Sequence, residues 1–131
     1  MIVDDDAYHA FALISILQQY SINCDMAMRG DQAYEMVESR FRAEGTSYNL
    51  ILMDSNAQNA TEAVSKIKSF IANNRPTNVA QPYYCLLAKQ SWNDELFKDK
   101  ARLDSIFDQF VSKPIFKAGV QSLLTKSGIL S

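Results

Sequence analysis

The chain has few of the residues that crosslink or interrupt a small protein. Its 131 residues include two cysteines, three prolines, four glycines and a single histidine. Cys24 and Cys85 are too few for a disulfide framework, and without a CxxC motif or a Cys/His cluster they predict no zinc site. Both lie in apolar stretches, where a reduced thiol behaves as a small buried hydrophobe.

Long apolar runs and a strong charge imbalance are also absent. No apolar run approaches the ~20 residues of a membrane span, and Asp4 follows so early that we expect no signal peptide. The formal charge is −2, whereas nucleic-acid binders of this size are usually basic, so we expect no DNA or RNA binding. These features predict one folded domain over residues 1–131, cytoplasmic and without membrane contact of its own.

Five short apolar runs alternate with stretches of helical periodicity. The runs cover residues 2–3, 22–28, 50–53, 83–87 and 110–111, and the helical stretches lie near 10–17, 33–41, 63–71, 91–103 and 116–124. Asp6 is placed to cap the first helix and Gly45 to end the second, and Phe116 lies on the apolar face of the last. This alternation predicts βα units and a mostly parallel sheet.

Three of the apolar runs end in residues that carry chemistry. Residues 4–6 are all aspartate, Asp54 follows the third run, and Ser112-Lys113-Pro114 follows the fifth. Each feature alone is ordinary, since acidic triplets usually cap helices and Lys-Pro usually forms a surface turn. The carboxyl ends of parallel strands, however, meet at one edge of the sheet, where such folds bind ligands.

Carboxylates gathered at this edge need neutralisation. Two of them about 5 Å apart repel by roughly 3 kcal/mol at an effective dielectric of 20, so a pKa rises or a cation binds. An all-oxygen, partly hydrated site suits Mg²⁺. With Lys113 supplying a further positive charge, the arrangement fits phosphoryl transfer to a carboxylate.

At these residues the whole chain resembles the receiver domains of two-component response regulators. Residues 2–6 are similar to the first strand and acidic pair, 29–33 to the turn into the second helix, 50–54 to the strand ending in the phospho-acceptor, and 110–115 to the last strand. The resemblance implies an α/β fold, a (βα)5 flavodoxin-like three-layer sandwich with sheet order 2-1-3-4-5. In that order the two cysteines lie on separate strands and do not pair.

The resemblance also implies residue roles. Asp54 is the phospho-acceptor, and Lys113 contacts its carboxylate or phosphoryl group. Asp5 binds Mg²⁺ directly, Asp4 binds it directly or through water, and Asn56 offers its backbone carbonyl. Asp54 completes this metal site.

Further expectations concern switching and the partner. Phe110 matches the aromatic residue whose rotamer changes on activation, and the Lys113–Pro114 bond is typically cis in such domains. The phosphoryl group comes from a histidine kinase or a histidine phosphotransfer protein, so the domain is an acceptor and not an enzyme. His9 is expected to be exposed on the first helix, and Trp92 to pack at the start of the fourth.

Two departures from the family pattern stand out. Leu87 occupies the place of a Thr or Ser whose hydroxyl binds a phosphoryl oxygen, and Ser91 is a candidate substitute donor. Gln58 and Glu62 replace the proline and glycine that commonly follow the acceptor. These departures support an alternative, a pseudo-receiver that binds partners with weak or no phosphorylation-driven switching.

A third hypothesis belongs to another class of protein. A small phosphohydrolase or flavodoxin-like enzyme is disfavoured because Asp54 lacks a second acid/base carboxylate and the chain lacks a phosphate-binding loop. The short first strand favours a piece of a longer protein over a stand-alone receiver. Extra residues around 41–48 resemble receivers attached to hybrid histidine kinases.

Overall fold

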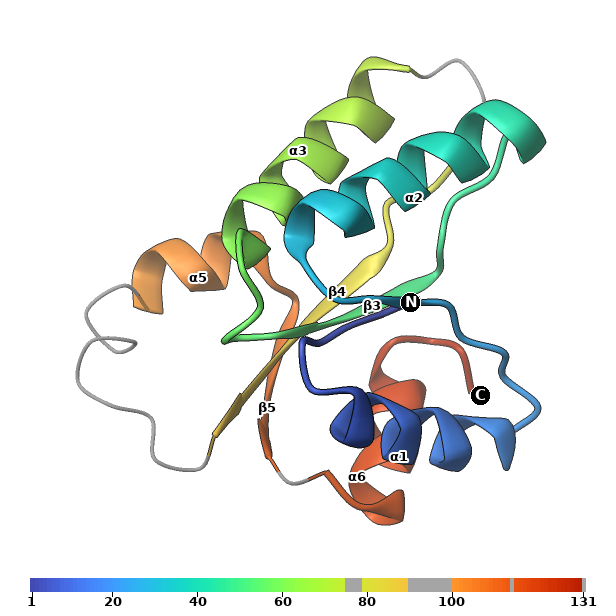
Figure 1. Ribbon diagram of the computed structural model, residues 1–131, viewed down its shortest axis with the longest axis vertical. Coiled ribbons are helices and arrows are strands. Elements are labelled where there is room, and N and C mark those ends of the chain that lie inside the picture. Colours follow the sequence, from blue (N-terminus) through green and yellow to red (C-terminus); the bar gives the residue numbers. More distant parts are fainter. Residues whose placement is uncertain (75–78, 90–99, 114, 131) are drawn as a thin grey trace.

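The computed structural model describes residues 1–74, 79–89, 100–113 and 115–130, in which strands and helices alternate (Figure 1). The order is β1 (Ile2–Val3), α1 (Ala7–Gln18), β2 (Met26–Ala27), α2 (Gly30–Glu44), β3 (Leu50–Asp54), α3 (Ala60–Asn73), β4 (Tyr83–Lys89), α5 (Lys100–Ile106), β5 (Gln109–Lys113) and α6 (Lys117–Lys126). None of these helices is both long enough and apolar enough to cross a membrane.

The five strands form one parallel sheet in the order β2-β1-β3-β4-β5, which confirms the expected topology. β3 lies at the centre, paired with β1 on one side and β4 on the other. All five of its residues are buried, as expected for a strand covered on both faces. Its last residue, Asp54, is therefore carried to the carboxyl edge from the middle of the sheet.

Helices cover both faces of the sheet and complete the three-layer sandwich. α2, α3 and α5 lie over one face, and α1 and α6 over the other (Figure 1). The side chains of β3 alternate between two apolar clusters, with Ile51 and Met53 in the first and Leu50 and Leu52 in the second. This alternation follows from the two-residue period of a strand.

The edge strand β2 is shorter than the apolar run that predicts it, and the two cysteines lie in different environments. β2 covers only Met26–Ala27 of the apolar run at 22–28. Cys24 precedes this strand and is half-buried, whereas Cys85 lies fully buried in β4, and both thiols are free. The prediction that the two cysteines do not pair is confirmed.

The prediction that Phe116 lies on the apolar face of the last helix is wrong. Its side chain is 70% exposed, and its extended backbone places it at the N-cap of α6. Helical periodicity begins one residue later, so Val120, Leu123 and Leu124 are buried, and Ile115 covers the core in place of Phe116. The two predicted helix boundaries are confirmed: Asp6 caps α1, and Gly45 ends α2 in a left-handed conformation with φ of 68°.

The loop after β3 packs directly on the first residue of α2. The Gly30 N–H donates to the Gln58 carbonyl at 2.7 Å. A β-carbon on Gly30 would lie 2.2 Å from the Asn59 carbonyl oxygen and 2.9 Å from the Ala63 β-carbon. Only glycine allows this approach, which ties the loop between β3 and α3 to α2.

We therefore expect Gly30→Ala to lower the free energy of unfolding by about 1–3 kcal/mol, because backbone must move to admit the methyl group. Ser39→Ala, at an exposed position of the same helix, is the control and should change stability by less than ~0.5 kcal/mol. Urea unfolding measures both. Equal stability of the two variants would show that the loop is not clamped at Gly30.

Candidate functional site

The aspartate triplet after β1 divides into three different environments. Asp4 is fully buried, and its Oδ1 accepts the N–H of Asp6 at 2.9 Å. Asp5 is exposed. Asp6 caps α1 by accepting the N–H groups of Tyr8 and His9 at 3.0 and 3.3 Å. The ordinary role of a helix cap therefore falls to Asp6, which leaves Asp4 and Asp5 for the site.

Asp54 and Lys113 meet across the intervening strand β4. Asp54 ends β3 and is 2% exposed, and Lys113 ends β5. The Lys113 Nζ lies 2.8 Å from Oδ1 of Asp54 and 3.6 Å from Oδ2 of Asp4. One ammonium group thus faces two buried carboxylates.

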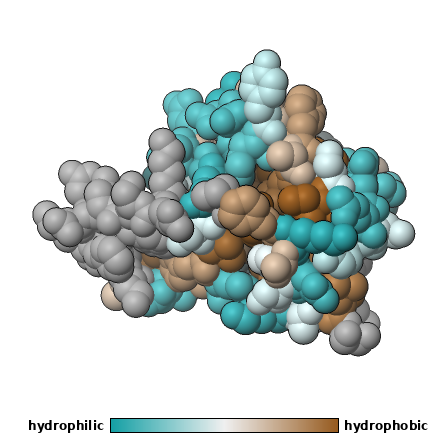
Figure 2. Space-filling model, turned by 90° about the horizontal axis from the view of Figure 1, so that it is seen from below, coloured by the Kyte–Doolittle hydropathy of each residue, from teal (hydrophilic) through white to brown (hydrophobic). Residues whose placement is uncertain are grey.

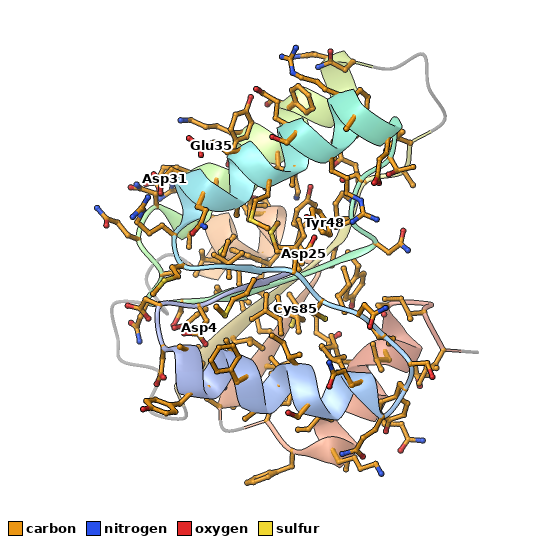
Figure 3. The ribbon with its side chains drawn as sticks, turned by 45° about the vertical axis from the view of Figure 1, so that its right-hand side comes forward. Asp4, Asp25, Asp31, Glu35, Tyr48 and Cys85 are labelled. Carbon is orange, nitrogen blue, oxygen red and sulfur yellow. The ribbon has the colours of Figure 1, made fainter. Side chains whose placement is uncertain are left out.

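Asp4, Asp5 and Asp54 each bring a carboxylate oxygen within 4.8 Å of the other two. At this separation each pair of charges repels by roughly 3 kcal/mol at an effective dielectric of 20. Figure 3 shows Asp4 where the sheet meets the start of α1. Oxygen ligands from two strand ends at one rim match the donor set that Mg²⁺ takes, with Asp5 on the solvent side.

The two buried carboxyls have opposite pKa shifts. Burial raises the pKa of Asp54, the charge of Asp4 adds to this rise, and Lys113 opposes it. Burial also acts to raise the pKa of Asp4, but hydrogen bonds from the Asp6 N–H and His9, together with the charge of Lys113, outweigh it and lower that pKa. Asp54 is therefore the carboxyl whose charge is least compensated.

His9 contacts the site, which sequence reasoning missed. Its Nδ1 donates to Oδ2 of Asp4 at 2.5 Å, and its side chain is 20% exposed, so the prediction of an exposed helical histidine is wrong. Helical side chains tilt toward the helix N-terminus, and His9 is the third residue of α1. The signal for this contact in the sequence was a histidine in the first helical turn, shortly after a strand that ends in aspartates.

Of the two predicted switch positions, Leu87 lies beside Asp54, and Phe110 packs against the apolar cluster on the other face of the sheet. Leu87 pairs in register with Asp54, its backbone carbonyl accepts the Ser55 N–H at 2.8 Å, and its side chain is buried in the apolar cluster under α1 and α6. Phe110 is half-buried and packs edge-on against Phe107, with ring centroids 6.2 Å apart. The place of the missing hydroxyl is therefore directly next to Asp54.

Other predicted residues are exposed or lie outside the described part. Asn56 is exposed in the turn two residues after Asp54. Ser91, Trp92 and Pro114 lie outside the described residues, so the substitute donor, the packing of Trp92 and the cis bond stay predictions.

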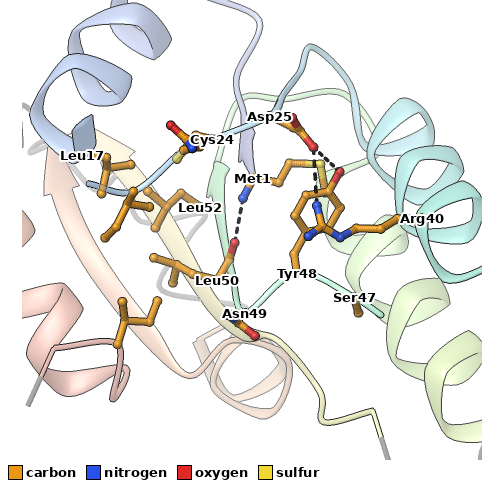
Figure 4. Close-up of a pocket in the computed structure, with 13 residues that line it drawn as sticks. Met1, Leu17, Cys24, Asp25, Arg40, Ser47, Tyr48, Asn49, Leu50 and Leu52 are labelled. Atoms are coloured by element: carbon orange, nitrogen blue, oxygen red, sulfur yellow. Dashed lines mark hydrogen bonds and ion pairs between the residues drawn. The ribbon is translucent and has the colours of Figure 1, made fainter. Parts of the chain in front are cut away.

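A cavity of about 340 Å³ lies at the opposite edge of the sheet from the carboxylate cluster (Figure 4). The Met1 ammonium donates to the Leu50 carbonyl at 2.8 Å. The Tyr48 hydroxyl donates to Asp25 at 2.6 Å, and the guanidinium of Arg40 lies 4.7 Å from the Tyr48 ring centroid. Burial and Asp25 raise the pKa of Tyr48 to about 12. Because these polar groups pair with one another, the carboxylate cluster is the stronger candidate site.

No model of a known protein family matches the chain, and neither does any curated protein sequence. Solved structures do match. A two-component response regulator from Legionella pneumophila has a TM-score of 0.75 at 19% identity, with 98% of this chain and 96% of that chain covered. A CheY-like receiver domain from Methylobacillus flagellatus has a TM-score of 0.72 at 19% identity, covering 96% and 94%.

A receiver domain protein from Clostridium thermocellum has a TM-score of 0.71 at only 10% identity, covering 96% of this chain and 90% of that chain. The chain therefore has the fold of response regulator receiver domains, as the sequence predicted. At these identities the similarity establishes the fold alone.

The raised pKa of Asp54 predicts how stability without metal depends on pH. A carboxyl whose pKa is higher in the folded state supports folding fully below its unfolded pKa, and that support is lost as pH rises through the folded pKa. The amide side chain of an Asp54→Asn variant does not titrate. In chelator, we expect this variant to gain stability over the wild type as pH rises from about 3 to about 7, measured by urea unfolding.

Asp104→Asn is the matched control, because Asp104 is exposed on α5. If the difference in stability between Asp54→Asn and the wild type were the same at all pH values, burial of the charged Asp54 carboxylate would not destabilise the fold.

Proposed function

We propose that this chain is a phospho-accepting signalling domain that receives a phosphoryl group from a phosphohistidine on a partner protein. The observation that carries this proposal is the contact of Lys113 with both Asp54 and Asp4, beside a third carboxylate, at the carboxyl edge of a receiver fold. The domain acts as an acceptor rather than as an enzyme on a separate substrate.

Asp54 is the residue that accepts the phosphoryl group. An oxygen of its carboxylate forms a bond to phosphorus while the P–N bond of the phosphohistidine breaks, and the leaving imidazole keeps the electron pair. Lys113 is placed to neutralise the negative charge of the transferred phosphoryl group, because its ammonium already contacts Asp54 Oδ1 at 2.8 Å. Such transfer depends mostly on positioning and charge neutralisation.

Asp5, Asp54 and the backbone carbonyl of Asn56 would hold Mg²⁺, and Asp4 would contact it directly or through water. Both Asp4 oxygens already accept hydrogen bonds, from Asp6 and His9, which favours the water-mediated contact. When bound, the cation neutralises the carboxylates and the transferring phosphoryl oxygens.

The partner is a histidine kinase or a histidine phosphotransfer protein. Support for a protein partner comes from aromatic side chains near the rim: Tyr8 is 88%, Phe11 56% and Phe116 70% exposed, at the starts of α1 and α6. Figure 2 shows hydrophobic residues exposed between hydrophilic ones on the face that carries these helices. Neither nucleic acid nor membrane is part of the proposal.

The second candidate is a pseudo-receiver that keeps the fold but switches weakly. Its support is Leu87, a buried apolar side chain paired in register with Asp54. A phosphoryl oxygen facing Leu87 forgoes a hydrogen bond to a charged group, worth roughly 1.5–3 kcal/mol. This loss bears on the response to phosphorylation more than on phosphorylation itself, since Lys113 and the cation neutralise the charge.

We expect one phosphoryl group to be added to the wild type by phosphoramidate and Mg²⁺, and none after chelation. Phosphoramidate carries the same P–N bond as phosphohistidine. Asp54→Asn should take up none, whereas Asp104→Asn, which removes an exposed carboxylate on α5, should behave as the wild type. Intact mass measures all four samples. Labelling of Asp54→Asn at the wild-type level would refute the assignment of the acceptor.

The pseudo-receiver alternative is tested at Leu87. Leu87→Thr restores the hydroxyl, and Leu87→Val has the shape of the threonine variant without its hydroxyl. Recovery of ~2 kcal/mol of differential interaction would shift the active-to-inactive ratio about thirtyfold. We expect phosphorylation to change amide exchange over β4 and α5 strongly only in Leu87→Thr. A large change already present in the wild type, unaltered by threonine, would show that Leu87 does not limit switching.

A further inference from the structure

Lys113 is the shared cation of the site, and its position decides which carboxylate is neutralised. Its Nζ lies 0.8 Å closer to Asp54 than to Asp4, by the difference of 3.6 and 2.8 Å. A lysine ammonium is a point charge on a flexible stem. Such a small difference is set by what else each carboxylate contacts, rather than by the reach of the lysine.

Asp4 has two donors besides the lysine. The Asp6 N–H binds Oδ1 of Asp4, and His9 Nδ1 binds Oδ2 at 2.5 Å, the same oxygen that faces Lys113. His9 is held in place because Asp6 accepts its backbone N–H at the start of α1. The imidazole and the lysine ammonium therefore face the same oxygen, and the imidazole lies closer to it, at 2.5 against 3.6 Å.

We propose that His9 is a positioning residue that satisfies Asp4 and thereby keeps Lys113 on Asp54. It does not touch the reacting atoms and acts through Lys113. Without the His9 donor, the fully buried Asp4 oxygen is left with Lys113, and the ammonium moves toward Asp4. Asp54 then meets an incoming phosphoryl group without its cation. The effect on phosphorylation rests on the proposed function, whereas the effect of His9 on the position of Lys113 does not.

The isosteres of histidine test which nitrogen matters. Asparagine places an amide N–H near the position of Nδ1, whereas glutamine places it near Nε2, which is buried and has no hydrogen-bond partner among the described residues. Leucine fills the space without a donor. A role through the Asp4 hydrogen bond requires rescue by His9→Asn and not by His9→Gln. A purely packing role predicts the reverse, because glutamine and leucine fill the space better.

The first arm measures the rate of labelling by phosphoramidate and saturating Mg²⁺. We expect His9→Leu and His9→Gln to label about 10- to 100-fold more slowly, as removal of supporting partners at metal sites does, and His9→Asn close to the wild type. In a Lys113→Met background, His9→Leu should cause no further loss, because the two residues act as one unit. Equal losses in both backgrounds, or wild-type labelling by His9→Leu, would overturn the proposal.

The second arm needs no phosphorylation. Thermal unfolding in chelator is measured for the wild type, His9→Leu, Lys113→Met and the double variant. We expect the shifts in melting temperature to be non-additive, because both side chains serve the same oxygen of Asp4. If the wild type takes up no phosphoryl group but the shifts are non-additive, the proposed function fails and the positioning role stands. Additive shifts would overturn the positioning role, whatever the labelling shows.

Discussion

The site depends on one ammonium group placed between two buried carboxylates. Asp4 and Asp54 are almost completely inaccessible to water, and charges in such places need partners or a shifted pKa. The contact of Lys113 with both is possible because β1, β3 and β5 are parallel and end at the same edge. The sheet thus assembles the charges, and the charges in turn make the edge a suitable place for a cation and a phosphoryl group.

The start of α1 belongs to the same arrangement. Asp6 caps the helix, its own N–H binds Asp4, and the helix it begins carries His9 back to Asp4. The three consecutive aspartates therefore differ in their surroundings: Asp4 is buried and hydrogen-bonded, Asp5 is exposed to solvent, and Asp6 caps the helix. The acidic triplet is specific because its members are not equivalent.

The departures from the receiver pattern fall on the other side of Asp54. Leu87 is part of the apolar cluster beneath α1 and α6 and also the register partner of Asp54. It contributes to the core at the position where the receiver pattern has a hydroxyl. The loop after β3 is held by the close approach of Gly30 to Asn59. Under the proposed function, acceptance of a phosphoryl group would rest on Asp54 and Lys113, and the response to it on the position of Leu87.

The sequence by itself determined the alternation of strands and helices, the strand order through a family resemblance, and the residues at the strand ends, because periodicity and strand-end position are local properties. It placed Phe116 on the apolar face of the last helix, whereas this side chain is exposed, because a cap residue precedes the helical period. It missed His9, because a contact with Asp4 depends on how α1 leaves the sheet. Only the tertiary structure decided which aspartate is buried and that Lys113 crosses β4 to reach Asp54, since burial and charge proximity arise when distant segments pack together.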